Sequence, residues 1–131
     1  MKILLIYPAD KHTIRTNVPP FVDQGIGVYP PLGLLYLASA IMRWSDWEVE
    51  ILDCNAEGID YQVLRDEIKK RKPDVVGIQA ITFTLIDVIM TAKTVKDINP
   101  QIPLRQDDRG RLQAATPWGR IRLPPDTICT I

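Results

Sequence analysis

This 131-residue sequence has few of the residues that several common functions require. It contains two cysteines, Cys54 and Cys129, and one histidine, too few for a disulfide framework or a four-ligand zinc site. Its 16 basic and 16 acidic side chains cancel, whereas nucleic acids and anionic membranes select a basic face. No apolar run approaches the roughly 18 residues of a membrane span, and the first run ends at Pro8, too early for a signal peptide. We therefore expect a reduced, cytoplasmic protein with neither nucleic acid nor membrane as a partner.

Charge and lysine usage change near residue 104. Residues 1–104 carry 11 basic and 13 acidic side chains, whereas residues 105–131 carry five arginines, three acidic side chains and no lysine. The last segment contains Pro117, Gly119, Pro124 and Pro125 and shows neither a helical nor a strand period. We predict a domain over 1–104 followed by an atypical arginine-rich tail over 105–131, of the kind that a frameshift, a truncated gene or a disordered appendage would produce.

Strand-like and helix-like segments alternate along residues 1–104. Apolar runs at 2–7 and 74–81 are typical of strands buried on both faces of a parallel sheet, and 47–53 alternates like an edge strand. Residues 32–43 are apolar nearly all round and predict a largely buried helix. A second helix is expected from the cap at Asp60 to about Arg71. A third begins at Thr84, with Asp87 completing a short capping box, and its expected core stripe is Leu85, Val88, Ile89, Ala92, Val95 and Ile98.

This order of elements predicts an α/β fold, an open parallel sheet in a three-layer α/β/α arrangement with right-handed crossovers. Only the beginning of a fourth strand follows at 102–104, so the sheet is expected to be truncated after the third helix. Such sheets bind ligands beyond the carboxyl ends of their strands, where the strand order reverses. The long loop 8–31, the segment 55–58 and the segment 79–84 are expected to meet there.

Three segments in this order and spacing resemble a known family: 30–38 (PPLGLLYLA), 48–58 (EVEILDCNAEG) and 72–78 (KPDVVGI). They are similar to the N-terminal cobalamin (B12)-binding domain of B12-dependent radical SAM proteins, of the kind found in oxygen-independent magnesium-protoporphyrin IX monomethyl ester oxidative cyclases. The resemblance covers about residues 1–104. It implies a flavodoxin-like (Rossmann-type) domain that holds cobalamin over the carboxyl ends of the strands, with the nucleotide tail of the cofactor against the sheet.

On this resemblance, the cofactor-binding residues follow the strands and open the first helix. A corrin needs a broad apolar platform, and its tail needs a slot lined by small and hydroxyl-bearing side chains. Thr82 and Thr84 suit that slot, but each hydroxyl would equally serve only its own turn or helix cap, so both interpretations stay open. The expected cofactor-binding set is Tyr7, Pro8, Leu32, Asn55, Gln79, Ala80, Ile81, Thr82 and Thr84.

Three features depart from the family pattern. The segment 10–15 (DKHTIR) is similar to an Asp-x-His-x-x-Gly motif whose histidine binds cobalt, but Arg15 replaces the glycine. We therefore expect His12 to be a solvated loop residue and predict no protein ligand to a metal. The glycine-glycine-proline-histidine turn after the fourth strand is replaced by 105–110 (RQDDRG). The CxxxCxxC run of a radical SAM cluster is missing, because Cys54 and Cys129 lie far apart.

The sequence therefore predicts a cobalamin-binding module that lacks the iron–sulfur catalytic domain and is not catalytic alone. Its expected partners are cobalamin and either a radical SAM domain or a second copy paired through an open sheet edge. The alternative is a remnant or protein-interaction domain that keeps the flavodoxin-like core without binding the cofactor. A flavin site is disfavoured because Pro8 and Asp10 stand where a phosphate-binding loop is required. A response regulator is disfavoured because Ala80 and Ile81 occupy the phosphoacceptor position. For Cys54, packing is the expected role.

Overall fold

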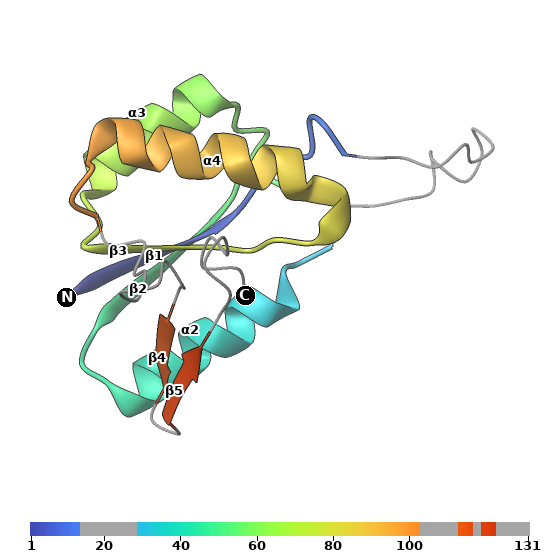
Figure 1. The fold of residues 1–131 in the computed structure, drawn as a ribbon. Helices are drawn as coiled ribbons and strands as arrows, with labels where there is room; N and C mark the ends of the chain where they lie inside the picture. Colours follow the sequence, from blue (N-terminus) through green and yellow to red (C-terminus); the bar gives the residue numbers. More distant parts are fainter. Residues whose placement is uncertain (14–28, 103–112, 117–118, 123–131) are drawn as a thin grey trace.

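A three-stranded parallel sheet organises this protein, whose computed structural model describes residues 1–13, 29–102, 113–116 and 119–122. Its elements in chain order are β1 (Lys2–Tyr7), α2 (Leu32–Trp44), β2 (Glu48–Asp53), α3 (Tyr61–Arg71), β3 (Val75–Ile78), the 3₁₀ turn η1 (Thr82–Thr84) and α4 (Leu85–Ile98). Strand β1 is central and pairs with both of its neighbours, so the strand order is β2-β1-β3. Figure 1 shows α3 and α4 over one face of the sheet and α2 over the other, which confirms the predicted three-layer, flavodoxin-like architecture.

Strand β1 supplies side chains to both hydrophobic cores, because successive strand residues point to opposite faces of the sheet. Leu4 and Ile6 belong to the core under α3 and α4, while Ile3 and Leu5 belong to the core under α2. All four are at most 6% exposed. Burial of each such side chain contributes about 1.5–3 kcal/mol to folding, which explains why the run at 2–7 is continuously apolar.

Helix α2 is less buried than its composition predicts. Only Leu34 and Ala38 are buried in the helix, whereas Leu32, Leu35 and Met42 are 65, 43 and 67% exposed. A helix that lies on one face of a sheet contacts that sheet along a single stripe. In the described part of the chain, α2 is the one helix on its face of the sheet, so the prediction of a largely buried helix was wrong.

Helix α4 buries a different stripe from the one predicted. Val88, Ala92 and Val95 pack inward as expected, but Leu85 and Ile89 are 51 and 49% exposed. The buried face of the helix is instead completed by the polar side chains Asp87, Thr91 and Thr94. The polar contacts made by Asp87, described below, explain this rotation of the helix relative to its apolar pattern.

The two predicted helix caps have different outcomes. Asp60 caps α3 as expected, since its Oδ1 accepts hydrogen bonds from the backbone N–H groups of Gln62 and Val63, both at 2.9 Å. At α4, Thr84 makes no side-chain capping bond, and its hydroxyl donates to the Ile81 carbonyl at 3.2 Å. The predicted capping box is therefore wrong.

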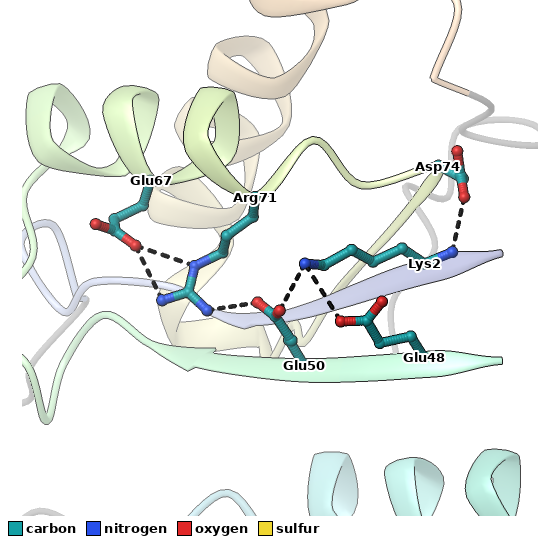
Figure 2. Close-up of polar contacts among 6 residues, drawn as sticks. All are labelled: Lys2, Glu48, Glu50, Glu67, Arg71 and Asp74. Atoms are coloured by element: carbon teal, nitrogen blue, oxygen red, sulfur yellow. Dashed lines mark hydrogen bonds and ion pairs between the residues drawn. The ribbon is translucent and has the colours of Figure 1, made fainter.

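An ion-pair network joins the amino-terminal half of the sheet to α3 (Figure 2). Glu50 on β2 lies at its centre, 2.6 Å from Lys2 Nζ and 2.6 Å from Arg71 Nη1. Arg71 also contacts Glu67, one helical turn earlier, at 2.9 Å, and Lys2 Nζ lies 3.5 Å from Glu48. The pKa of Glu50 is lowered, first by its hydrogen bond with Lys2 and then by the one with Arg71. The network therefore ties β1, β2 and α3 together.

The tail over 105–131 is not wholly without strand structure. Strands β4 (Gln113–Thr116) and β5 (Gly119–Arg122) form an antiparallel hairpin, which contradicts the prediction that no strand period follows residue 104. The two strands are close in the chain, so their pairing is a local structure. It makes no contact with the other described elements. Residues 103–112, where a fourth parallel strand was considered, lie outside the described residues.

Strand β3 lies at one edge of the described sheet, and the pairing of a second copy was expected at such an edge. Among the described strands, β3 pairs only with β1, so the expected pairing of a second copy at a sheet edge stays a prediction.

In the parts of the chain that the structure describes, no helix has the length and apolar character needed to cross a membrane.

Candidate functional site

The carboxyl ends of the three parallel strands lie at one edge of the sheet (Figure 1), and the predicted site residues lie at or just after these strand ends and at the start of α2. Hydrogen bonds continue past the strands on both sides of β1: Cys54 N–H donates to the Tyr7 carbonyl at 3.0 Å, and Gln79 N–H donates to the Ile6 carbonyl at 2.9 Å. These bonds hold the starts of the loops in register. The edge thus collects Tyr7 at the end of β1 and Pro8 after it, Asn55 after β2, Gln79 to Thr84 after β3, and Leu32 at the start of α2.

The turn after β2 is held by Asp53. Its Oδ1 accepts hydrogen bonds from the backbone N–H groups of Asn55 at 3.1 Å and Ala56 at 2.9 Å. Gly58 adopts a positive φ of 63°, a conformation that glycine reaches at the lowest cost. Across the edge, burial and then the charges of Asp53 and Asp10 raise the pKa of Tyr7, so its phenol stays neutral and keeps a hydrogen to donate.

The segment after β3 offers both apolar and polar groups. Ile81 and Phe83 are 46 and 57% exposed, and Thr82 is exposed beside them. Gln79 carries a side-chain oxygen, Oε1, that is buried without a hydrogen-bond partner in the described structure. Thr84 is buried, and its hydroxyl already donates to the Ile81 carbonyl. Of the two interpretations of Thr84, the structure therefore favours the one in which it stabilises its own turn.

A buried carboxylate joins the loop after β1 to α3 and α4. Asp87, in the first turn of α4, is fully buried, and its Oδ2 accepts the backbone N–H of His12 at 2.9 Å. Its Oδ1 lies 3.0 Å from His12 Nδ1 and accepts a hydrogen bond from the Tyr61 hydroxyl. The His12 and Tyr61 rings stack with centroids 6.2 Å apart and planes inclined by 25°. We call His12, Tyr61 and Asp87 the carboxylate cluster.

The carboxylate cluster stabilises the ionised form of Asp87. Burial alone would raise the pKa of this carboxyl, but the hydrogen bonds from Tyr61 and His12 outweigh burial and leave the pKa lowered. Burial, followed by the hydrogen bond to Asp87, raises the pKa of Tyr61. Tyr61 therefore remains a donor at neutral pH, and Asp87 remains a charged acceptor.

Asp87 and Tyr61 were not predicted as members of this cluster, and His12, exposed in its loop as expected, makes a contact with Asp87 that was not foreseen. Asp87 was interpreted as part of a helix cap and Tyr61 received no role, while His12 was expected to be solvated. The His12 side chain is 49% exposed, yet it is held on one side by Asp87. The available signal was an acidic residue among the apolar positions at the start of α4; its partners are 75 and 26 residues away in the chain.

Cys54 has the packing role that was expected for it. Its side chain is 2% exposed within the core under α3 and α4. Burial, together with the charges of Asp53 and Glu57, raises the pKa of its thiol to about 12, so it is not a nucleophile at neutral pH. No group of three or more histidine, cysteine or acidic side chains arranged to hold a metal occurs among the residues that the structure describes.

Comparison with known proteins identifies the family. The sequence model of the B12 binding domain matches residues 22–104. Over 102 residues, the chain is 38% identical to an uncharacterized methyltransferase of Pyrococcus horikoshii and 28% identical to the anaerobic magnesium-protoporphyrin IX monomethyl ester cyclase of Rubrivivax gelatinosus. Each alignment covers 78% of this chain but only 20% and 17% of the two relatives, so the chain spans about a fifth of their length. No solved structure matches significantly. The chain belongs to the B12-binding domain family, and cobalamin is the cofactor that this membership implies.

Proposed function

We propose that this chain is the cobalamin-holding module of a radical SAM-type system and that the iron–sulfur cluster of that system is held by other residues. Two cysteines in 131 residues cannot supply the three thiolates of such a cluster. When bound, cobalamin supplies cobalt chemistry that no amino-acid side chain provides. We propose a cytoplasmic location, in keeping with a buried, unpaired Cys54.

The observation that carries this proposal is the buried, unpartnered Oε1 of Gln79 at the carboxyl edge of the sheet. A buried acceptor without a donor costs about 1–3 kcal/mol, and cobalamin carries amide and hydroxyl groups that would donate to it. Exposed apolar side chains lie close in sequence at Ile81 and Phe83, which suits a ligand with a broad apolar disc. The residues present therefore fit the cofactor.

Each part of the edge has a distinct task in this proposal. Gln79 accepts a hydrogen bond from the cofactor, and Tyr7 donates one, because its raised pKa keeps the phenol protonated. Ile81 excludes water from the apolar face of the ligand. Asp87 holds the loop after β1 in place through the backbone and ring of His12, so it acts as a positioning residue.

The proposal includes no cobalt ligand from the protein. His12 Nδ1 is occupied by Asp87 at 3.0 Å, which leaves only Nε2 for any further contact. We therefore expect His12→Ala to leave the absorption spectrum of the bound corrin unchanged, because we propose that the His12 imidazole does not bind cobalt in the original protein. A spectral shift toward the unligated form in this variant would show that His12 coordinates cobalt.

Titration of the purified chain with hydroxocobalamin, followed by corrin absorbance, tests cobalamin binding. We expect Gln79→Leu and Ile81→Glu each to raise the Kd about tenfold, which corresponds to about 1.4 kcal/mol. Trp47→Glu is the control, because Trp47 is 45% exposed against 46% for Ile81 but lies just before β2, at the amino ends of the strands. Its affinity should equal that of the unmodified protein.

Two results would contradict the proposal. No spectral change and no retained pigment at about 50 μM protein would exclude useful cobalamin binding and would leave the protein-interaction domain as the function of the fold. Equal weakening by Trp47→Glu and Ile81→Glu would show that the ligand does not lie at the carboxyl edge.

A further inference from the structure

Helix α2 has two apolar stripes, and only one of them packs against the sheet. The inner stripe, Leu34, Leu37, Ala38 and Ile41, lies in the core that α2 shares with β1 and β2. The outer stripe contains Leu32, Leu35, Tyr36, Ser39 and Met42, all exposed. A shallow groove of about 620 Å³ borders the outer stripe, lined by Leu35, Ala38, Ser39, Met42, Arg43, Val49 and Ile51.

The outer stripe has the spacing of a helix–helix seam. Leu32, Leu35, Ser39 and Met42 follow one another at intervals of three, four and three residues, which is the a/d pattern of packed helices. Leu32, Leu35 and Met42 are 65, 43 and 67% exposed, and Tyr36 beside them is 78% exposed. These four side chains expose on the order of 500 Å², a large part of the roughly 800 Å² that each partner contributes to a standard interface.

The seam is complementary to itself when a second copy runs antiparallel. A two-fold axis at the level of Leu37 places Leu35 opposite Ser39 of the second copy and, by symmetry, Ser39 opposite Leu35 of the second copy. The same axis places Leu32 opposite Met42 of the second copy. Each large side chain at the centre thus faces a small one, as close helix packing requires, and an isologous contact uses the same patch twice.

The charges on α2 favour the same arrangement. Arg43 is the one charged residue of the helix, and its guanidinium lies 5.5 Å from the centre of the Trp44 ring. In an antiparallel pair the two Arg43 backbones are about 18 Å apart along the helix axis, whereas a parallel pair would bring the like charges together. We propose that this protein forms an antiparallel homodimer through the outer stripe of α2.

Sedimentation velocity of the full chain over a series of concentrations, without cobalamin, tests the dimer. We expect a reversible dimer, and we expect Leu35→Glu with Met42→Glu to lower the association constant at least about 100-fold, because four carboxylates then meet in an apolar seam. Ile86→Glu with Ile89→Glu is the matched control. These residues are 48 and 49% exposed on α4, so the control adds the same charge elsewhere and should leave the association constant unchanged.

A swap of two residues tests the antiparallel register. Leu35→Ser alone and Ser39→Leu alone should each weaken association about tenfold. The first removes the large side chain of the central contact, and the second places two large side chains opposite each other. The double variant restores one large and one small residue at each central contact, so its association constant should return to within about threefold of the original. Far-UV circular dichroism verifies folding, and the swap decides the question if the glutamate variant fails to fold.

Several outcomes would overturn the proposal. A chain that stays monomeric at about 200 μM has no useful self-association. A dimer that survives the paired glutamates in α2, or that is lost equally with those in α4, uses another surface. An association constant that is lower for the double variant than for either single variant excludes the antiparallel register.

Discussion

Replacing Asp87 with asparagine tests whether the carboxylate cluster organises the carboxyl edge of the sheet. The change keeps the size of the side chain but removes its charge. It also places an amide N–H₂ group where one carboxylate oxygen accepts bonds from His12 and Tyr61. One donor of the cluster then faces another donor in a buried position, because Asp87 is fully buried. We expect a substantial loss of stability.

The magnitude follows from the hydrogen bonds that are lost. A hydrogen bond to a charged group contributes about 1.5–3 kcal/mol. His12 and Tyr61 are partly exposed, so their freed donors regain some hydration. The variant loses one hydrogen bond to residue 87, and a second hydrogen bond is weakened because its acceptor is no longer charged. We therefore expect the free energy of unfolding to fall by about 2–3 kcal/mol. For a domain of this size, that lowers Tm by about 10 °C or more.

Urea unfolding followed by far-UV circular dichroism measures this loss. Asp97→Asn is the matched control, because Asp97 lies on the same helix but its side chain is 47% exposed and 3.4 Å from Arg65. An exposed pair of this kind contributes at most about 1 kcal/mol. A loss for Asp87→Asn no larger than that for Asp97→Asn would refute the assigned role of the cluster.

The same variant has a defined pH dependence. The pKa of Asp87 is lower in the folded protein than its ordinary value, so the unfolded chain binds more protons in the acidic range. The stabilisation is complete above the unfolded pKa of about 3.9 and is lost as the pH falls through the lowered folded pKa. The difference in stability between the original protein and Asp87→Asn should therefore narrow from about pH 5 toward about pH 2. A constant difference would contradict an ionic role for Asp87.

Three further predictions concern the turn after β2, the ion-pair network and the buried thiol. Gly58→Ala should destabilise the domain by about 1 kcal/mol, because a φ of 63° is strained for alanine. Gly33→Ala, in the open first turn of α2, should leave stability unchanged or raise it by up to about 1 kcal/mol. Equal changes in Tm for Gly58→Ala and Gly33→Ala would contradict both expectations. Arg71→Ala should lower the free energy of unfolding in urea by about 1–2 kcal/mol, because it removes the ion pair that links Glu50 to α3. A loss that is equally large in about 1 M salt would show that the contribution of Arg71 is not ionic. Cys54 should resist iodoacetamide at pH 8 in the native state and react after unfolding, because its thiol pKa is about 12; rapid native labelling at this site, detected by mass spectrometry, would show that the thiol is accessible.

The fold was predictable because its signals are local. The apolar run at β1 and the cap at Asp60 depend on residues that are neighbours in the chain, and both appear in the structure as expected. Parallel strands separated by helices then leave few topologies to consider. The gathering of Tyr7, Asn55 and Gln79 at one edge follows from this topology alone.

The carboxylate cluster was not predictable, because its members are distant in the chain. His12 and Asp87 are 75 residues apart, and Tyr61 comes from a third element. Their contacts also rotate α4, which exposes Leu85 and Ile89 although both fit the apolar period of the helix. A periodic pattern indicates that a helix has an apolar face, but it does not determine which of two neighbouring faces turns inward when a buried polar contact competes.

The sequence by itself determined the alternating α/β order, the edge of the sheet where a ligand is expected and the resemblance to the cobalamin-binding family. These depend on local periodicity, caps and the spacing of short segments. Only the tertiary structure decided that Thr84 closes its own turn, that Gln79 has a buried acceptor to offer, and that α2 leaves an apolar stripe uncovered. The physical reason is that burial and hydrogen-bond partners are set by elements brought together in space, and residue order alone does not specify how those elements rotate against one another.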